Sequence, residues 1–453
     1  MGAVAYSQTK SLCPECLELI PALTYQVGHK VFMKKICPDH GEYETLIWKG
    51  PPSYVDWHVN KIPWSPEKPS NSSDKGCPFD CGLCSKHRQQ TCTALIEVTQ
   101  RCNLHCGFCF ADSNNDESTD PTVDQIKSLY ESIADSGPQS NIQLSGGEPT
   151  LRDDLPEITA IGRSIGFDFI QINTNGIRLA NDPAYVESLK SSGIASIFLQ
   201  FDGTEDSIYL DLRGKPLLET KMRAIEQCAQ NDIGVVLVPT IVPGMNDHNI
   251  GSIIRFAIAI SPVVRGVHFQ PVSYFGRFPK TSAKMRRITI PEIIRSLEVQ
   301  TDGSVTSDDF SPPTCENPKC SFKGSFVLMP DNTLKSFTNK QSTCCASGPI
   351  KAELGADMAR RFVSAKWSAQ QPCCSSGADG GMSLGQWDTI LERARTHSFS
   401  ISGMAFQDVW NVDLERLKDC CIHVATDSGL IPFCAYNITA RNGRALYRGR
   451  TDI

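Results

Sequence analysis

Three cysteines just after residue 100 carry the clearest chemical signal in the sequence. Cys102, Cys106 and Cys109 follow an apolar run and have the spacing C-x3-C-x2-C. The next cysteine downstream is Cys228, so no fourth thiol lies nearby in the sequence. Three thiolates on one loop can hold three irons of a [4Fe–4S] cluster and leave the fourth iron open to a ligand. The spacing therefore predicts a reactive iron–sulfur cluster rather than a structural one.

A second triplet, Cys77, Cys81 and Cys84, repeats this spacing. It follows a stretch rich in Pro and Ser rather than a strand, and Cys92 comes soon after it as a candidate fourth ligand. Four thiolates would bind every iron of a cluster and leave none open. We therefore expect these four cysteines to hold an auxiliary [4Fe–4S] cluster, with a zinc site as the alternative.

The N-terminal part contains a further set of potential ligands. Cys13-Pro-Glu-Cys16 and Cys37-Pro-Asp-His40 have the spacing of a rubredoxin-like or zinc-ribbon knuckle. In such a knuckle two hairpins surround one tetrahedral iron or zinc ion, and the sequence does not distinguish the two metals. Three cysteines are clear ligands, and the fourth is either His40 or a cysteine from elsewhere.

The C-terminal part is also rich in cysteine. We expect a second auxiliary cluster there, with ligands from Cys315, Cys320, Cys420 or Cys421, and Cys434. Two adjacent pairs lie in stretches rich in Gly and Ser and are expected to be free thiols: Cys344 with Cys345, and Cys373 with Cys374.

Between residues 93 and about 300, short apolar runs alternate with amphipathic helical patterns. This alternation is typical of parallel strands joined by crossover helices. Six units are too few for an eight-stranded barrel, so we expect an α/β fold with an open, partial (β/α)6 barrel. The expected strands are 93–99, 141–145, 168–173, 196–201, 234–241 and 265–271, and the expected helices are 122–135, 154–164, 183–192, 218–231, 248–259 and 291–299.

The C-terminal ends of these strands should carry the binding residues, because parallel β/α folds bind ligands there. The second strand ends in Gly146-Gly147-Glu148-Pro149, where the glycines permit close approach of a ligand and Glu148 can accept hydrogen bonds from an ammonium group. His268, near the end of the sixth strand, is expected to be a core residue rather than a catalyst. The remaining polar candidates are Asn173, Asn175, Gln200, Asp202 and Arg213.

Composition limits the possible classes of protein. With 453 residues, 40% hydrophobic and 21% charged, the chain resembles ordinary globular proteins. Its net charge of −6 does not favour binding to nucleic acid, and no apolar run approaches the roughly 18 residues of a membrane span. Twenty cysteines without a signal peptide predict metal ligands and a cytoplasmic location. We expect four parts: a metal knuckle (1–60), an auxiliary-cluster segment (61–92), the partial barrel (93–300) and a C-terminal substrate and cluster region (301–453).

Together these motifs resemble those of radical S-adenosylmethionine (SAM) enzymes. The resemblance is to the branch that contains the archaeal tetraether lipid synthases and the dihydropterin dimethyltransferase-like proteins. It is carried by Ser11-Leu-Cys-Pro-Glu-Cys16, Cys37-Pro-Asp-His-Gly-Glu-Tyr43, Gly76-Cys-Pro-Phe-Asp-Cys-Gly-Leu-Cys84, Glu97-Val-Thr-Gln-Arg-Cys-Asn-Leu-His-Cys106 and Ile431-Pro-Phe-Cys-Ala-Tyr-Asn437.

The resemblance implies a mechanism and a set of contacts. SAM binds the open iron held by Cys102, Cys106 and Cys109, and one electron, from a donor such as ferredoxin or flavodoxin, cleaves it to a 5′-deoxyadenosyl radical. That radical removes hydrogen from an unactivated C–H bond. The segment at Glu148 then contacts the SAM amino group and Arg213 its carboxylate, while the other polar residues at the strand ends contact its ribose or carboxylate. The auxiliary clusters relay electrons or capture a substrate intermediate.

We expect the reaction to form a carbon–carbon bond on, or alkylate, a lipid or another small molecule. Methylation of a heterocycle such as a pterin is the first alternative. An iron–sulfur electron carrier or scaffold without SAM chemistry is the second. The C-terminal part departs most from the family pattern, and for that reason the substrate stays open.

Overall fold

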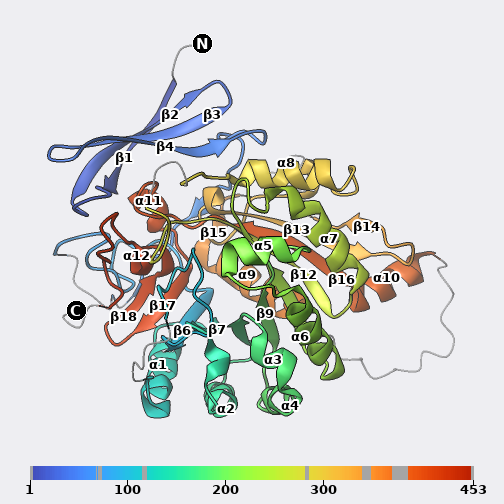
Figure 1. The fold of residues 1–453 in the computed structure, drawn as a ribbon. Coiled ribbons are helices and arrows are strands. Elements are labelled where there is room, and N and C mark those ends of the chain that lie inside the picture. Colours follow the sequence, from blue (N-terminus) through green and yellow to red (C-terminus); the bar gives the residue numbers. More distant parts are fainter. Residues whose placement is uncertain are drawn as a thin grey trace.

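A sheet of mostly parallel strands runs through the centre of the protein, with helices packed against it (Figure 1). The structure is a computed structural model that describes residues 4–67, 69, 74–114, 120–280, 285–338, 348–369 and 386–449. The cysteine pairs predicted to be free thiols, Cys344 with Cys345 and Cys373 with Cys374, lie outside these ranges.

The six predicted strands are present and lie side by side in their order along the chain. Every pairing between neighbours is parallel. All five residues of the fifth strand are buried, as expected for a strand covered on both faces. The predicted partial barrel is therefore confirmed. Its strands are β6 (Thr93–Thr99), β7 (Asn141–Gly146), β8 (Ile170–Thr174), β9 (Ser196–Gln200), β10 (Gly234–Val238) and β12 (Val264–Pro271), with the short β11 (Thr240–Ile241) paired to β12.

Two strands from the C-terminal part extend this sheet at its edges. β16 (Ser398–Met404) pairs in parallel with β12, and β17 (Ile422–Thr426) pairs in parallel with β6. The described residues thus contain eight neighbouring parallel strands, and the sheet continues past residue 300, the predicted limit of the barrel. Antiparallel strands follow at both edges and leave the barrel open: β13 (Ser321–Leu328) with β14 (Leu334–Ser336) beyond β16, and β18 (Gly429–Pro432) beyond β17.

Helices connect the parallel strands, and several of them form the row along the lower edge of Figure 1. The first begins with a capping box, in which Thr122 and Gln125 each bond the backbone N–H of the other. The six predicted helices are present, and two short ones were not predicted. The helices are α1 (Val123–Asp135), α2 (Leu155–Ile165), α4 (Pro183–Ser191), α6 (Leu218–Gln230), α7 (Ile250–Ala259) and α8 (Ile290–Gln300), together with the additional α3 (Ile177–Asn181) and α5 (Asp206–Arg213).

A longer helix, α9 (Ala352–Trp367), crosses the end of the barrel at which the strands begin. Asn141, the first residue of β7, donates a hydrogen bond of 3.2 Å to the carbonyl of Arg360. The carbonyl of Trp367 lies against Gly234, the first residue of β10, where a Cβ atom would come within 2.5 Å of it. α9 therefore spans from one side of the barrel to the other at this end.

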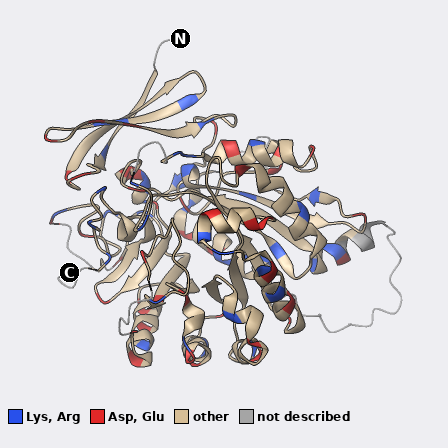
Figure 2. Ribbon diagram, viewed as in Figure 1, with Lys and Arg blue, Asp and Glu red and all other residues tan. Residues whose placement is uncertain are grey.

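A separate antiparallel sheet of four strands forms the N-terminal module (Figure 1). Basic and acidic residues are interspersed along the described elements (Figure 2), in keeping with the small net charge of −6. No helix of the described ranges is both long and apolar enough to cross a membrane. The strands of the module are β1 (Val4–Leu12), β2 (Leu19–Val27), β3 (Lys30–Cys37) and β4 (Gly41–Lys49); the other short elements are β5 (Lys61–Ile62), β15 (Ile350–Lys351), α10 (Gln386–Thr396), α11 (Leu414–Leu417) and α12 (Phe433–Asn437).

A buried lysine joins this module to the C-terminal part. Lys35 on β3 is 1% exposed, and its ammonium group donates hydrogen bonds to the carbonyls of Leu12 (2.8 Å) and Val409 (2.5 Å). Burial lowers the pKa of Lys35 to about 7, against the opposing influence of the Asp408 carboxylate. The contact between the two parts therefore contains a group that titrates near neutral pH.

This pKa gives a testable pH dependence. Between pH 7 and pH 10 the unfolded chain binds a proton at Lys35 that the folded chain has released, so this group makes folding more favourable as the pH rises. We expect the free energy of unfolding of the wild type, minus that of Lys35→Met, to grow by up to about 1.4 kcal/mol per pH unit in this range. Denaturant unfolding at several pH values measures it. Lys34→Met, which removes the neighbouring half-exposed lysine, is the control; a pH-independent difference for Lys35→Met would contradict the expectation.

Candidate active site and metal centres

The loop after β6 carries the three cysteines of the predicted SAM-binding cluster. Cys102, Cys106 and Cys109 pack together in one apolar group with Tyr209, and all three line the same cavity. Burial raises the pKa of the Cys102 thiol to about 12, and the nearby charges of Glu148 and the other two cysteines add to the effect. A bound metal would deprotonate such thiols. Three thiols on one loop facing one cavity suit a [4Fe–4S] cluster with an open iron.

Arg277 holds this loop in shape. Its backbone exchanges two hydrogen bonds with the backbone of Cys109, at 2.9 and 3.0 Å. Its guanidinium group donates to the carbonyls of Cys106 (2.8 Å) and Ser113 (2.9 Å). No motif in the sequence indicates a role for Arg277, which lies in the loop after β12. The loop that carries the cysteines is therefore fixed by a part of the chain more than 160 residues away.

Two predicted SAM-binding residues form a buried ion pair with each other. Arg213 donates to both carboxylate oxygens of Asp202 at 2.7 Å, and the two side chains are 5% and 0% exposed. Burial alone would lower the pKa of Arg213, but the Asp202 carboxylate raises it above its ordinary value. Arg213 also reaches the carbonyl of Phe108 in the cluster loop, at 3.4 Å. The pair thus connects the end of β9 to the loop, and Arg213 lines the cavity.

The Gly-Gly-Glu-Pro segment packs against the protein itself. A Cβ atom on Gly146 would lie 2.1 Å from the carbonyl oxygen of Thr99, and one on Gly147 would lie 2.1 Å from that of Arg101. The sequence predicts that these glycines permit the close approach of a ligand, but the backbone that leads into the cluster loop occupies the space beside them. All of Gly146, Gly147 and Glu148 nevertheless line the cavity.

Glu148 joins the ends of two strands. Its carboxylate accepts hydrogen bonds from the backbone and hydroxyl of Thr150, from the hydroxyl of Thr174 and from the backbone of Asn175, at 2.6 to 3.2 Å. The following Pro149 is buried at the start of a short 3-10 turn. The protein already provides four donors to this carboxylate, so any contact with an ammonium group would be an addition to this network.

The other polar strand-end residues also face the cavity. Asn175 donates to the side chain of Asn103 in the cluster loop at 2.7 Å, whereas Asn173 donates to Ser145 and leaves its buried Oδ1 without a partner among the described residues. Gln200 accepts from the ammonium group of Lys221 at 3.3 Å.

Lys221 is a second residue of the site that was not predicted. It is fully buried on α6, and burial lowers its pKa to about 8. A signal was present, because Lys221, Ala224, Ile225 and Cys228 follow the spacing of one buried helix face. A lysine on such a face indicates a polar partner in the interior, here Gln200 and the carbonyl of Asn175.

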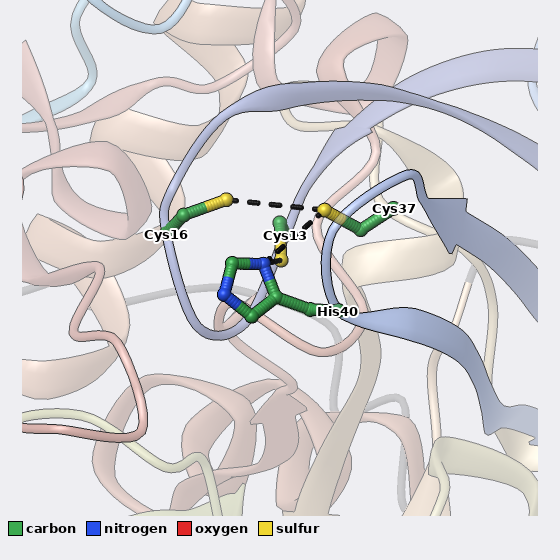
Figure 3. A group of neighbouring side chains, drawn as sticks. All are labelled: Cys13, Cys16, Cys37 and His40. Carbon is green, nitrogen blue, oxygen red and sulfur yellow. Dashed lines mark hydrogen bonds between the residues drawn. The ribbon is translucent and has the colours of Figure 1, made fainter.

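The N-terminal knuckle brings its predicted ligands together (Figure 3). Cys16 and Cys37 have their sulfur atoms 3.9 Å apart, and Nδ1 of His40 lies 3.7 Å from the sulfur of Cys13 and 3.4 Å from that of Cys37. A tetrahedral ion with metal–sulfur bonds of about 2.3 Å has its ligands about 3.8 Å apart. The four side chains therefore suit one mononuclear metal ion, with His40 as the fourth ligand.

Comparison with known proteins identifies the family. Residues 96–257 match the model of the radical SAM superfamily, and residues 5–49 match that of the HMPTM N-terminal zinc ribbon domain. Over 484 aligned residues, covering 96% of this chain and 94% of the relative, the chain is 36% identical to 7,8-dihydro-6-hydroxymethylpterin dimethyltransferase of Methanocaldococcus jannaschii. The chain belongs to the radical SAM superfamily. Within it, the chain falls in the predicted branch of dihydropterin dimethyltransferase-like proteins.

Other similar proteins match less than half of the chain. The chain is 32% identical to the GTP 3′,8-cyclase of Pasteurella multocida over 136 residues, which are 29% of this chain and 39% of that protein. The crystal structure of Streptococcus suis SuiB bound to S-adenosylmethionine aligns with a TM-score of 0.39 at 16% identity, over 48% of each chain. Methylornithine synthase (PylB) aligns with a TM-score of 0.36 at 18% identity, over 48% of this chain and 64% of that one.

Membership of this radical SAM branch defines the cofactors. The protein is a radical SAM enzyme and uses a [4Fe–4S] cluster and SAM. The first module is a zinc ribbon, and the additional cysteine groups fit auxiliary clusters. The positions of the cysteines indicate which of them could share one auxiliary cluster.

Cys92 does not join the triplet that precedes it. Its sulfur lies 2.9 Å from that of Cys421, and together with Cys315 they form a buried group with ligand atoms within 4.8 Å of one another. The reason is backbone pairing, because the N–H of Cys92 donates to the carbonyl of Cys421 at 2.8 Å, next to the pairing of β6 with β17. The prediction that Cys92 is the fourth ligand beside Cys77, Cys81 and Cys84 is therefore wrong, because Cys92 lies with Cys315 and Cys421.

The predicted C-terminal set is also divided. Cys315 and Cys421 join Cys92, whereas the other members make separate contacts. Arg416 donates to the sulfur of Cys320 at 3.2 Å, and the backbone of Gln407 donates to that of Cys434 at 3.2 Å. Cys434 packs in one apolar group with Cys77 and Cys81. The thiol of Cys420 donates a hydrogen bond to the carbonyl of Ile422. Within the described ranges, only the ribbon and the Cys92 group bring three or more ligand atoms within 4.8 Å.

The role of the cluster loop can be tested with two cysteine variants. We expect Cys106→Ala to lose about four irons per chain and all formation of 5′-deoxyadenosine from SAM, because the cluster loses one of three ligands. Iron analysis and product chromatography under anaerobic conditions measure both. Cys228→Ala, at a buried cysteine of α6 away from the cysteine groups, should keep both, and full SAM cleavage by Cys106→Ala would show that other cysteines hold the reactive cluster.

The ribbon site can be tested separately. We expect His40→Ala to reduce the zinc or iron bound at the ribbon and to lower the melting temperature of the protein, since structural ions contribute directly to folding. Metal analysis of the reconstituted protein gives the content. His29→Ala, at an exposed histidine in the same module, is the control, and undiminished metal in His40→Ala would exclude His40 as a ligand.

Proposed function

We propose that this radical SAM enzyme is a methyltransferase that acts on a heterocyclic small molecule such as a pterin. The observation that carries the proposal is a set of five carboxamide side chains that line the cavity: Gln143, Asn173, Asn175, Gln200 and Gln270. A carboxamide both donates and accepts hydrogen bonds, as does the edge of a pterin ring. The relative that is 36% identical over nearly its whole length is named as a pterin dimethyltransferase.

The cavity is suited to hold SAM and a substrate near each other. Its volume is about 350 Å³, and it extends from the cluster loop through the interior of the barrel to α9. Several of these carboxamides already bond neighbouring side chains, but the buried Oδ1 of Asn173 has no partner among the described residues. Burying such a group without a hydrogen bond costs about 1–3 kcal/mol. A heterocycle can supply the missing donor, whereas a hydrocarbon chain cannot.

The chain's own residues have defined tasks in this proposal. Cys102, Cys106 and Cys109 would hold the cluster, which with SAM supplies one-electron cleavage and a carbon radical that removes hydrogen. Arg277 keeps the loop in position, and the pair of Arg213 and Asp202 fixes it to the end of β9. Aromatic side chains exclude water between SAM and substrate: Phe108, Phe110, Phe275 and Phe433. A ferredoxin or flavodoxin is the proposed electron donor.

The geometry also suggests which cysteines hold an auxiliary cluster. We assign one to Cys92, Cys315 and Cys421, which line the same cavity as the cluster loop. The triplet Cys77, Cys81 and Cys84 would hold another, with Cys434, which packs in one apolar group with Cys77 and Cys81, as a candidate fourth ligand.

A second candidate function is carbon–carbon bond formation on an aliphatic chain. The observation that favours it is the apolar part of the cavity, which includes Phe322, Phe362, Met404 and Phe406. In that case the carboxamides would bind a polar head group rather than a ring.

Product mass distinguishes the two functions. With reduced cluster, SAM carrying a 13C methyl group and 6-hydroxymethyl-7,8-dihydropterin, we expect a pterin product heavier by whole methyl or methylene units, and 5′-deoxyadenosine alongside it. Mass spectrometry detects both, and Cys106→Ala provides the inactive control. Vigorous SAM cleavage without any change in the pterin, but with coupled products from a lipid extract, would refute pterin methylation in favour of the second function.

A further inference from the structure

Three aromatic rings form one wall of the cavity, deeper in the barrel than the strand ends. Phe198 on β9, His268 on β12 and Trp367 at the end of α9 all line the cavity. Their ring centroids are 5.4 to 5.7 Å apart, so each ring packs against the other two. We call these three residues the ring wall.

Strand β16 fixes two of the rings. Ser400 and Ser402 are two residues apart and therefore point to the same face of the sheet. Trp367 donates its indole N–H to the hydroxyl of Ser400 at 3.1 Å, and Nδ1 of His268 shares a hydrogen bond of 2.9 Å with the hydroxyl of Ser402. Residues from β9, β12, α9 and β16 thus build the wall jointly, which explains why no sequence motif reveals it.

The wall contains one ring nitrogen, Nε2 of His268, that is available for a hydrogen bond. Nδ1 of His268 is bound to Ser402, and Nε2 has no hydrogen-bond partner among the described residues. Burial lowers the pKa of His268 to about 4, so the imidazole is neutral at physiological pH. A neutral imidazole has one donor and one acceptor nitrogen, and the hydroxyl of Ser402 can complement either form.

We propose that the ring wall is the surface that recognises the substrate ring. A planar, uncharged heterocycle lies against Phe198 and Trp367 and exchanges one hydrogen bond with Nε2 of His268. The inference rests on the proposed function, which it deepens by naming the residues that select the ring. Aromatic walls favour flat rings through offset or edge-on contacts, and a single polar atom in such a wall rejects a substrate that cannot pair with it. Selection would then depend on α9, which supplies Trp367.

Binding measurements test this directly. With SAM-loaded, reconstituted protein under anaerobic conditions, the Kd of 6-hydroxymethyl-7,8-dihydropterin is measured by equilibrium dialysis, beside that of naphthalene as an apolar bicyclic probe. We expect His268→Phe, which keeps an aromatic ring, to raise the pterin Kd by roughly tenfold, the size of one lost hydrogen bond, without weakening naphthalene binding. His248→Phe, at an exposed histidine outside the cavity, is the matched control.

A second variant, Ser402→Ala, tests the inference independently in case His268→Phe does not fold. Ser402→Ala keeps the imidazole but removes its orienting partner, and should raise the pterin Kd by roughly threefold. An unchanged pterin Kd in either variant overturns the ring-wall inference, while the proposed function stands if the wild type methylates the pterin. A wild type that neither binds nor methylates the pterin overturns both.

Discussion

Parallel strand pairing at the two edges of the barrel is the constraint on which the rest of the site depends. β17 pairs with β6, the strand that leads into the cluster loop, and β16 pairs with β12. The first pairing brings Cys421 to Cys92, and the second sets Ser402 beside His268. Without these two edge strands the barrel would still have its six central strands, but the cavity would lack one wall and one cysteine group.

The central barrel could be predicted because its strands are short apolar runs separated by helices with a clear buried face. β10 is buried throughout, and the helices that follow the strands show the expected periodicity. The edge strands could not be predicted in the same way. β16 has serines at alternate positions, and β17 is joined to β6 across more than 300 residues, so neither reads as part of a repeating β/α unit.

The cysteines show what spacing alone can establish. Spacing predicted two groups whose members the structure brings together: the three cysteines after β6, which line one cavity, and the four residues of the knuckle. In both cases the residues lie within one or two turns of the chain. Spacing failed for Cys92, whose position depends on a backbone hydrogen bond to Cys421 rather than on its distance along the chain from Cys84. The glycines of the Gly-Gly-Glu-Pro segment are a similar case, since the space that they leave is filled by the backbone of Thr99 and Arg101.

Opposite charges stabilise the strand ends that surround the cavity. Asp202 is paired with Arg213, and Glu148 is satisfied by backbone and hydroxyl donors. Lys221 lies close enough for both carboxylates to offset part of the effect of its burial. Removing one partner of the buried pair of Arg213 and Asp202 would leave an uncompensated charge. Arg213 also contacts the carbonyl of Phe108, so this pair links the end of β9 to the cluster loop. The cysteine group of Cys92, Cys315 and Cys421 lines this same cavity, whereas the ribbon ligands do not. The two cysteine groups therefore differ in their access to the cavity, which their spacing along the chain does not reveal.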